Sequence, residues 1–204
     1  MPKVIQKGFE FKEVYFAYPE SENQILKGVS LSIKAGEKIA FVDQNGAGKT
    51  TTIKMMSTLI MPTDGEIKVL GYDTKKDYMK IREKLNVSPQ ETAIAPNLSV
   101  KENLEFMAGV YKIKDKDIKI KELIKMFKLE EVLKQKAKTL SGGYQRKLSI
   151  AISLINNPKI LFLDEPTTGV DPVSRKEFWQ MLKRLQQKGI TILVSTPYMD
   201  EAAL

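Results

Sequence analysis

The chain has 204 residues, with 33 Lys and Arg against 25 Asp and Glu, and it contains neither Cys nor His. Its length suits a single domain with a substantial core, and no stretch approaches the roughly 20 apolar residues that a membrane-spanning helix requires. The lack of Cys excludes disulfide and thiol chemistry, and the lack of His excludes imidazole catalysis and imidazole metal ligation.

The formal charge of +8 comes mainly from lysines, which cluster in residues 112–121 and 134–138. A surface for nucleic acid or for anionic membrane can be built in this way. These lysines alternate with Ile, Leu, Asp and Glu at helical spacing, which favours the solvated faces of amphipathic helices. The charge therefore does not identify a partner.

The first 72 residues are predicted to form short strands and one helix. Residues 9–15 alternate apolar and polar side chains, as a half-exposed strand does. Residues 39–42 are a short apolar run that leads into a glycine-containing loop and a helix from about 49 to 59. Residues 65–70 indicate a further strand.

From about residue 73 to 140 the pattern becomes helical, and Ser99 and Glu102 have the spacing of a capping box. After residue 157 strand and helix patterns alternate again. Such alternation predicts a parallel α/β core, here interrupted by a helical insertion near 73–157 and preceded by an antiparallel edge.

The end of the chain supplies one further helix and strand. Asp171 can cap a helix, Pro172 sits at its favoured first position, and Gly189 can close it. Residues 190–194 form the next buried apolar strand.

The loop before the first predicted helix has the composition of a phosphate-binding P-loop. Gly46 and Gly48 let the backbone wrap closely around an anion. Lys49 can reach the β- and γ-phosphates, and the Thr50 hydroxyl can ligate Mg²⁺. Thr51 extends the helix N-terminus, whose N–H groups face the phosphates. The alternative is a simple glycine turn between a strand and a helix.

Two segments in the second half of the chain have a specific order. Residues 140–147, Leu-Ser-Gly-Gly-Tyr-Gln-Arg-Lys, are a polar helix start with paired glycines, which suits a phosphate. The apolar run 160–163 then delivers Asp164 and Glu165 at its carboxyl end. This ordered pair resembles the signature motif and the Walker B strand of the ATP-binding cassette (ABC) ATPases, and the resemblance covers nearly the whole chain.

The resemblance implies an α/β P-loop NTPase (RecA-like) fold: a parallel-sheet core, an N-terminal antiparallel β edge and an inserted helical subdomain. Residues 1–204 are expected to form one ABC ATP-binding domain. Residues 1–72 and 158–204 would form the β edge and ATP-binding core, and 73–157 the helical subdomain with the signature motif. Because ABC domains usually continue past such a C-terminus, we expect a truncated domain, such as one cassette of a tandem-cassette protein.

The same resemblance implies ATP and Mg²⁺ as cofactors. Thr50, Gln90 and Asp164 would hold the metal, and Glu165 and Gln90 would be catalytic, Glu165 by orienting or deprotonating the attacking water. Gln90 would also couple to the membrane partner. The residues expected to contact nucleotide are Tyr18, Asn45, Gly46, Ala47, Gly48, Lys49, Thr50 and Thr51 and, on the ATP of another subunit, Ser141, Gly142 and Gly143.

Three of these assignments keep alternatives. Tyr18 matches the aromatic residue that stacks on adenine, but it could be a strand-edge tyrosine. Gln90 could be an exposed loop residue. Asp171 matches the D-loop at the dimer seam, although its capping role already explains it.

The chain departs from the family pattern at two positions. Asp43 replaces a P-loop glycine, and we expect its carboxylate to weaken nucleotide binding. Pro197 replaces the histidine that contacts the γ-phosphate, and proline has no donor and no protonatable group. Losing one such contact commonly costs ~10² to 10³ in rate, so strong hydrolysis at this chain's own P-loop is not expected.

Because the signature is intact, we predict an asymmetric head-to-tail pair with a second cassette that carries the histidine. Four further segments resemble those of bacterial or archaeal exporters of the drug-resistance or ABC-2 type: residues 46–51, 62–66, 97–104 and 167–172. This resemblance implies a transmembrane permease partner, export and a peripheral location on the cytoplasmic face of the cell membrane. One alternative is a regulatory cassette that binds nucleotide without hydrolysis. Another is a soluble ABC ATPase acting on nucleic acid or ribosomes, although no nucleic-acid partner is expected.

Overall fold

The computed structural model describes residues 7–19, 21, 23–42, 48–89, 93–168 and 170–198. The strands are β1 (Lys7–Phe16), β2 (Leu26–Lys34), β3 (Lys38–Val42), β4 (Asp64–Val69), β5 (Tyr72–Asp73), β6 (Leu85–Ser88), β7 (Ile160–Asp164) and β8 (Thr191–Thr196). The α-helices are α1 (Lys49–Met56), α2 (Tyr78–Arg82), α3 (Val100–Val110), α4 (Lys116–Phe127), α5 (Gly142–Ser153) and α6 (Pro172–Gln187).

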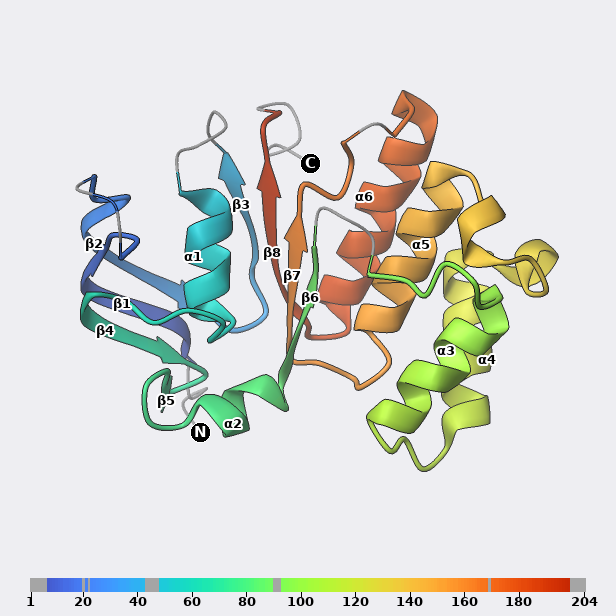
Figure 1. Ribbon diagram of the computed structural model, residues 1–204, viewed down its shortest axis with the longest axis horizontal. Helices are drawn as coiled ribbons and strands as arrows, with labels where there is room; N and C mark the ends of the chain where they lie inside the picture. The colour runs from blue at the N-terminus through green and yellow to red at the C-terminus, as the bar shows by residue number, and fades with distance from the viewer. Residues whose placement is uncertain are drawn as a thin grey trace.

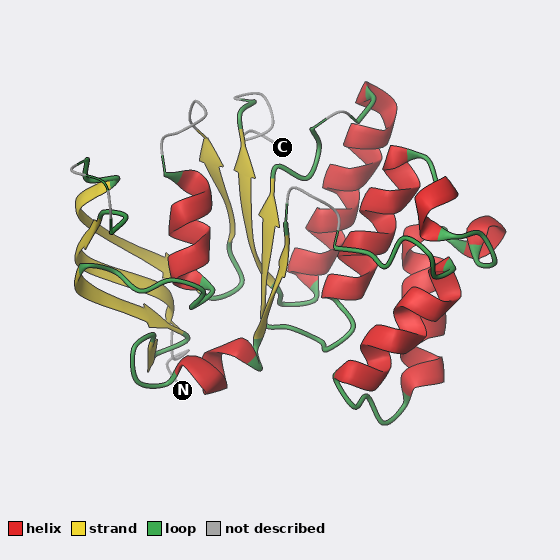
Figure 2. Cartoon of the chain, viewed as in Figure 1, coloured by secondary structure: helices red, strands yellow, loops and turns green. Residues whose placement is uncertain are grey.

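The molecule is built in layers (Figure 1). An antiparallel sheet of order β2-β1-β4-β5 lies on one side of α1, and a parallel sheet of order β3-β8-β7-β6 lies on the other. Helices α5 and α6 cover the far face of the parallel sheet, and α3 and α4 lie beyond them (Figure 2). The expected antiparallel edge, parallel core and helical part are all present.

The antiparallel sheet is centred on β1, which pairs with β2 and β4. Phe9 pairs with Ile33 on one side and Val69 on the other, and all three side chains are buried. The Phe9 ring also meets Phe162 of β7 edge to face, with 5.7 Å between the ring centroids. This contact joins the two sheets beside α1.

The two central strands of the parallel sheet are buried on both faces, as parallel strands are. In β7, Phe162 joins the apolar cluster that includes α1, whereas Leu161 and Leu163 join the cluster that includes α5 and α6. The alternation of strand side chains therefore fastens one helix layer to each face.

The helical pattern predicted from about residue 73 was wrong for one segment. Residues 85–88 form β6, which pairs in parallel with β7 and is the edge strand of the core sheet. The segment has only four residues, too few for periodicity to separate a strand from a helix. The first helix, α1, also ends at Met56 rather than near residue 59.

The predicted helix starts are confirmed. Ser99 accepts a hydrogen bond from the Glu102 N–H, and the Glu102 carboxylate accepts one from the Ser99 N–H, which completes the capping box. The Asp171 carboxylate accepts from the Ser174 N–H at 3.0 Å at the start of α6. None of the helices described in the structure has the length and apolar character needed to cross a bilayer.

Candidate functional site

The four parallel strands end at the same edge of their sheet, and α1 begins there (Figure 1). Ligands of open α/β sheets bind in the crevice outside the carboxyl ends of the strands. Asp164 is the last residue of β7, and Ser195 and Thr196 are the last residues of β8. The candidate site is therefore the space between these strand ends and the start of α1.

The start of α1 depends on a glycine. Gly48 has φ +89°, in the left-handed region that favours glycine, and a Cβ there would come within 2.8 Å of the Ile25 side chain. No side chain caps the helix. The Thr52 N–H and hydroxyl both donate to the Gly48 carbonyl, at 2.8 and 2.9 Å. The arrangement leaves the helix N-terminus as an anion-binding end.

Asp164 and Thr50 face each other across this space. The Thr50 hydroxyl lies 3.1 Å from Oδ2 and 3.4 Å from Oδ1 of Asp164. The Ser195 hydroxyl donates to Oδ1 of the same carboxylate, which is buried. Segments more than a hundred residues apart thus bring a hydroxyl and a carboxylate together.

This oxygen set fits Mg²⁺. A hard cation prefers carboxylate and hydroxyl oxygens, and Mg²⁺ is commonly held by one or two protein ligands together with waters and substrate phosphates. The described ranges contain no group of three or more acidic side chains that could hold a metal by themselves. Thr50 and Asp164 therefore suit a metal that arrives with a phosphate ligand.

Glu165 follows directly and has a constrained backbone. Its φ is +43°, which is uncommon for a residue other than glycine. Its N–H donates to both the carbonyl and the hydroxyl of Ser195, each at 3.0 Å. The Thr168 hydroxyl donates to its Oε2 at 3.3 Å. Such strain persists only where neighbouring groups hold the residue in place.

Arg146 extends from α5 to the backbone segments that follow β6 and β7. Its guanidinium donates to the Pro89 carbonyl at 2.8 Å and to the Glu165 carbonyl at 3.2 Å. Burial lowers the pKa of Arg146, and the nearby charge of Asp164 opposes that shift. Sequence reasoning missed both Arg146 and Ser195. The signal for Arg146 was a cation on the apolar face of the helix that follows the signature.

The predicted signature residues lie at the N-terminus of α5. Ser141 is the N-cap and accepts from the Tyr144 N–H at 3.5 Å. Ser141, Gly142 and Gly143 are exposed, and a Cβ on either glycine would meet nothing within 4 Å. This end of the helix is open for an approaching group.

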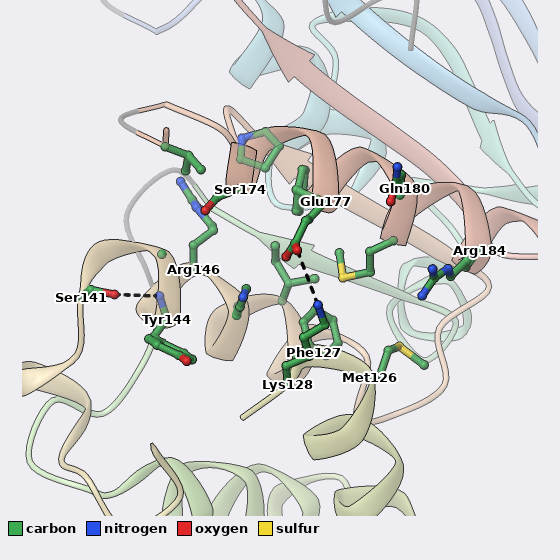
Figure 3. Close-up of a pocket in the computed structure, with 17 residues that line it drawn as sticks. Met126, Phe127, Lys128, Ser141, Tyr144, Arg146, Ser174, Glu177, Gln180 and Arg184 are labelled. Atoms are coloured by element: carbon green, nitrogen blue, oxygen red, sulfur yellow. Dashed lines mark hydrogen bonds and ion pairs between the residues drawn. The ribbon is translucent and has the colours of Figure 1, made fainter. Parts of the chain in front are cut away.

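A cavity of about 260 Å³ lies beside the signature, between α5 and α6 (Figure 3). Ser141, Gly143 and Arg146 line it together with apolar side chains. At its rim the Lys128 ammonium lies 3.5 Å from the Glu177 carboxylate.

Tyr18 lies close to the start of α1. Its hydroxyl is 3.2 Å from the Thr51 hydroxyl, and its ring meets Phe16 edge to face at 5.0 Å. The residue is 40% exposed. Tyr18 is thus brought to the start of α1 and remains accessible to solvent.

The structure brings together Tyr18, Gly48, Thr50, Thr51, Asp164 and Glu165 of the predicted set, and Lys49 is the first residue of α1. Asn45, Gly46, Ala47 and Gln90 lie outside the described residues, as does Asp43. Pro197 follows β8 directly. Its neighbour Tyr198 packs under the Arg175 guanidinium of α6, at 4.8 Å from the ring centroid.

Comparisons with known proteins agree with this geometry. A family model described as ABC transporter matches residues 26–168. The probable multidrug ABC transporter ATP-binding protein YbhF of Escherichia coli (strain K12) is 41% identical over 176 residues, which are 85% of this chain and 30% of that protein. The linearmycin resistance ATP-binding protein LnrL of Bacillus subtilis (strain 168) is 38% identical over 179 residues, which are 87% of this chain and 58% of that protein.

Two solved structures have the same fold. CbiO1 from Clostridium perfringens, described as part of the ABC transporter complex cbiONQ, has a TM-score of 0.85 and 28% identity, and the match covers 96% of this chain and 80% of that chain. A dimeric ATP-binding cassette in a post-hydrolysis state, bound to ADP and Pi, has a TM-score of 0.84 and 31% identity, covering 95% and 90%.

The chain spans only 30% and 58% of the lengths of the two curated relatives. Three observations agree over the length of this chain. They are the family match, the relatives, and the position of Asp164, at the end of β7, beside the start of the uncapped helix α1. The chain belongs to the ABC transporter family and is an ATP-binding domain of the ABC ATPase class.

Proposed function

We propose that this cassette binds ATP with Mg²⁺ at the carboxyl edge of the parallel sheet and powers export through a membrane-spanning partner. One observation carries the proposal: Thr50, at the start of an uncapped helix, lies 3.1 Å from Asp164 at the end of a buried strand. A hydroxyl and a carboxylate at this spacing are the oxygen donors that would hold a cation arriving with phosphate.

Each residue has a defined task in this proposal. Lys49 and the N-terminus of α1 bind the phosphates, and Tyr18 supports the adenine. Thr50, Asp164 and Gln90 would hold Mg²⁺, which when bound would offset the negative charge of the phosphates. Glu165 orients or deprotonates the attacking water, and its double tether to Ser195 keeps its position fixed.

The cassette would work in an asymmetric head-to-tail pair. Ser141, Gly142 and Gly143 are exposed at the N-terminus of a helix, as a group that completes a partner's site must be. Pro197 offers no donor to a γ-phosphate, so this chain would turn over its own ATP slowly. The dimeric cassette among the structural relatives supports the pairing.

The whole complex would lie with this chain on the cytoplasmic face of the cell membrane. The names of two relatives, a multidrug transporter protein and a linearmycin resistance protein, favour drug-like substrates. The substrate would pass through the permease rather than contact the cassette.

A second candidate function rests on Pro197. A cassette without the histidine could bind nucleotide as a regulatory subunit and never hydrolyse it. The hydrogen bonds that hold Glu165 favour retained hydrolysis instead: its N–H donates to Ser195 and its carboxylate accepts from Thr168, which keeps the carboxylate in one position.

Nucleotide binding is tested by photolabelling this chain with an azido-ATP analogue in membranes that contain its complete transporter. Lys49→Ala should reduce labelling at least about tenfold. Lys54→Ala is the matched control, since Lys54 lies on the last turn of the same helix. Equal labelling of both variants would overturn the proposed site.

Hydrolysis is tested by the ATPase rate of the reconstituted transporter. Glu165→Gln in this chain should remove the share of the rate that comes from its own site, while Glu66→Gln on the exposed face of β4 should not. If Glu165→Gln left the rate unchanged and labelling intact, the regulatory function would be favoured.

A further inference from the structure

Arg146 is a charged residue in the wall between the helical layer and the ATP-binding core. It lies one turn into α5, next to the buried residues Leu148 and Ile150, and only 8% of its surface is exposed. A cation is rarely buried to this extent unless its donors are used. Its position therefore requires an explanation from its contacts.

Two hydrogen bonds of Arg146 join segments that follow neighbouring strands. Nη1 donates to the carbonyl of Pro89, which follows β6. Nη2 donates to the carbonyl of Glu165, which follows β7. A guanidinium presents its donors in a rigid planar fork, so one side chain fixes the spacing of both carbonyls.

The second of these carbonyls is the backbone carbonyl of Glu165, whose side chain is the proposed catalytic carboxylate. Ser195 holds the Glu165 N–H, and Arg146 holds the Glu165 carbonyl. With both ends of the residue tethered, the backbone keeps its φ of +43° and the side chain leaves the strand in one direction. Without Arg146 the carbonyl end is released, and the residue can relax towards ordinary backbone angles.

We propose that Arg146 is a positioning residue for hydrolysis: it holds Glu165 and the segment after β6 at a fixed spacing from the signature helix. The inference rests on the proposed function, because it needs Glu165 to act on water at this site. Arg146 acts through the two carbonyls, so its loss should lower kcat while the KM for ATP changes little.

A purely structural role predicts a different pattern. If Arg146 only filled the wall, its replacement would lower the melting temperature and the yield of assembled transporter. The rate per assembled transporter would then stay at the wild-type value. The ATPase rate per assembled transporter therefore separates the two roles.

The experiment uses the complete transporter in proteoliposomes, with assembled complex quantified in each sample. Arg146→Gln removes the charge and most of the N–H donors of the guanidinium. Arg146→Lys keeps the charge but has a single ammonium group in place of the planar guanidinium. Arg82→Gln is the matched control, because the Arg82 guanidinium on α2 also donates to a backbone carbonyl, that of Thr58 at 2.7 Å, outside the proposed site. The combination of Arg146→Gln with Glu165→Gln completes a double-mutant cycle.

We expect Arg146→Gln to lower the Glu165-dependent part of the rate about tenfold or more. Arg146→Lys should lower it less, and Arg82→Gln should leave it unchanged. In the double variant, Arg146→Gln should add almost nothing to the loss caused by Glu165→Gln, since the two residues act as one unit.

Three outcomes would overturn the inference. Full rates in Arg146→Gln and Arg146→Lys, alongside a loss in Glu165→Gln, would reject the positioning role and leave the proposed function intact. Losses that multiply in the double variant would show that Arg146 acts independently of Glu165. A Glu165→Gln variant with the full rate would reject hydrolysis at this site, and the positioning role with it.

Discussion

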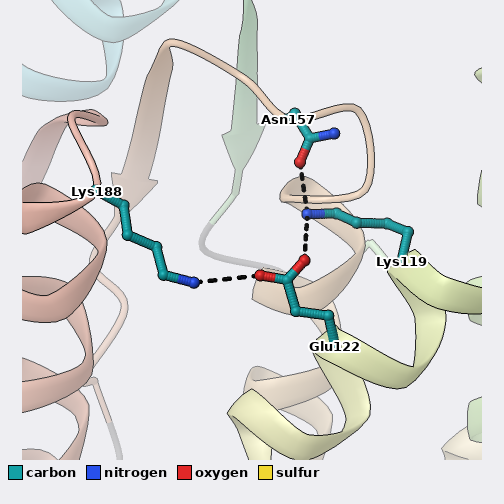
Figure 4. A network of polar contacts seen from close by, with 4 residues as sticks. All are labelled: Lys119, Glu122, Asn157 and Lys188. Atoms are coloured by element: carbon teal, nitrogen blue, oxygen red, sulfur yellow. Dashed lines mark hydrogen bonds and ion pairs between the residues drawn. The ribbon is translucent and has the colours of Figure 1, made fainter.

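The two ends of the parallel sheet carry similar polar groups in opposite environments. At the carboxyl end, Asp164 and Ser195 are buried and bonded to each other. At the amino end, Lys188 precedes β8, and it meets Glu122 of α4 at 3.2 Å, partly in solvent (Figure 4). A carboxylate is thus bound by a hydroxyl inside the protein at one end and by an ammonium group near the surface at the other.

The difference shows why one end can carry chemistry. Buried polar groups cannot exchange their partners for water, so removing one leaves another unsatisfied. Exposed ion pairs are screened and are worth about 1 kcal/mol or less. At the amino end, Lys119 contacts both Glu122, at 3.5 Å, and Asn157, at 2.6 Å, and this network ties α4 to the core as a local brace.

The largest effect is expected from Asp164→Asn. The change removes the negative charge that faces Thr50 and weakens the proposed metal site, so the ATPase rate of this chain's own site should fall ~10² to 10³. The measurement is the Mg²⁺ dependence of the rate in reconstituted transporter. Asp117→Asn, on the exposed start of α4, is the control and should change nothing. An unchanged Mg²⁺ dependence in Asp164→Asn would contradict the metal assignment.

A gain of function is expected next, from Pro197→His. The change returns a donor to the end of β8, and the own-site rate should rise by up to ~10². The readout is the Glu165-dependent part of the ATPase rate, compared between Pro197→His and Pro197→Ala. A rise with alanine as large as with histidine would mean that release of the proline backbone, rather than the new donor, explains the gain.

Much of the carboxyl end could be predicted from the sequence, because its residues occur in short ordered runs. Gly48, Lys49 and Thr50 sit between a strand and a helix pattern, and Asp164 and Glu165 end an apolar run. Each run fixes its own local structure, and parallel strands bring their ends to one edge. The pairing of Thr50 with Asp164 follows from that topology.

The contacts made by single residues could not be predicted. Ser195 looks like any strand serine, and although Arg146 lies on the apolar face of its helix, its two carbonyl partners are known only from the packing of α5. Their roles depend on distances between segments, which periodicity does not contain. The edge strand β6 was missed for a related reason, since its four residues become a strand only beside β7.

A smaller effect is expected from Ser195→Ala. Its hydroxyl donates to Asp164 and accepts from the Glu165 N–H, but that N–H keeps the Ser195 carbonyl at 3.0 Å. Loss of the hydroxyl should cost about 1 to 3 kcal/mol of unfolding free energy, together with a severalfold loss of rate.

Ser153→Ala is its matched control, because the Ser153 hydroxyl is also buried and donates within α5, to the Ile150 carbonyl at 2.8 Å. Thermal unfolding and ATPase rate are measured on both variants. Both should lose stability, and only Ser195→Ala should lose rate per folded protein. A rate loss in Ser153→Ala of the same size would mean that stability alone explains the effect.

The smallest effect is expected at the amino end, from Glu122→Gln. Burial by itself would raise the pKa of Glu122, but the hydrogen bond from Lys188 and the charges of Lys119 and Lys188 outweigh it and leave the pKa below its ordinary value.

A lowered carboxyl pKa in the folded state stabilises the protein above the unfolded-state pKa, and that stability is lost as the pH falls through the folded-state pKa. The difference in melting temperature between wild type and Glu122→Gln should therefore be present near about pH 7 and decrease as the pH falls below the ordinary glutamate pKa of about 4.3. Because the pair is partly exposed, the difference in stability should be less than about 1 kcal/mol. It should shrink at an ionic strength of about 1 M, because salt screens exposed charges. A difference that persisted in acid would mean that Glu122 stabilises the brace by packing rather than by charge.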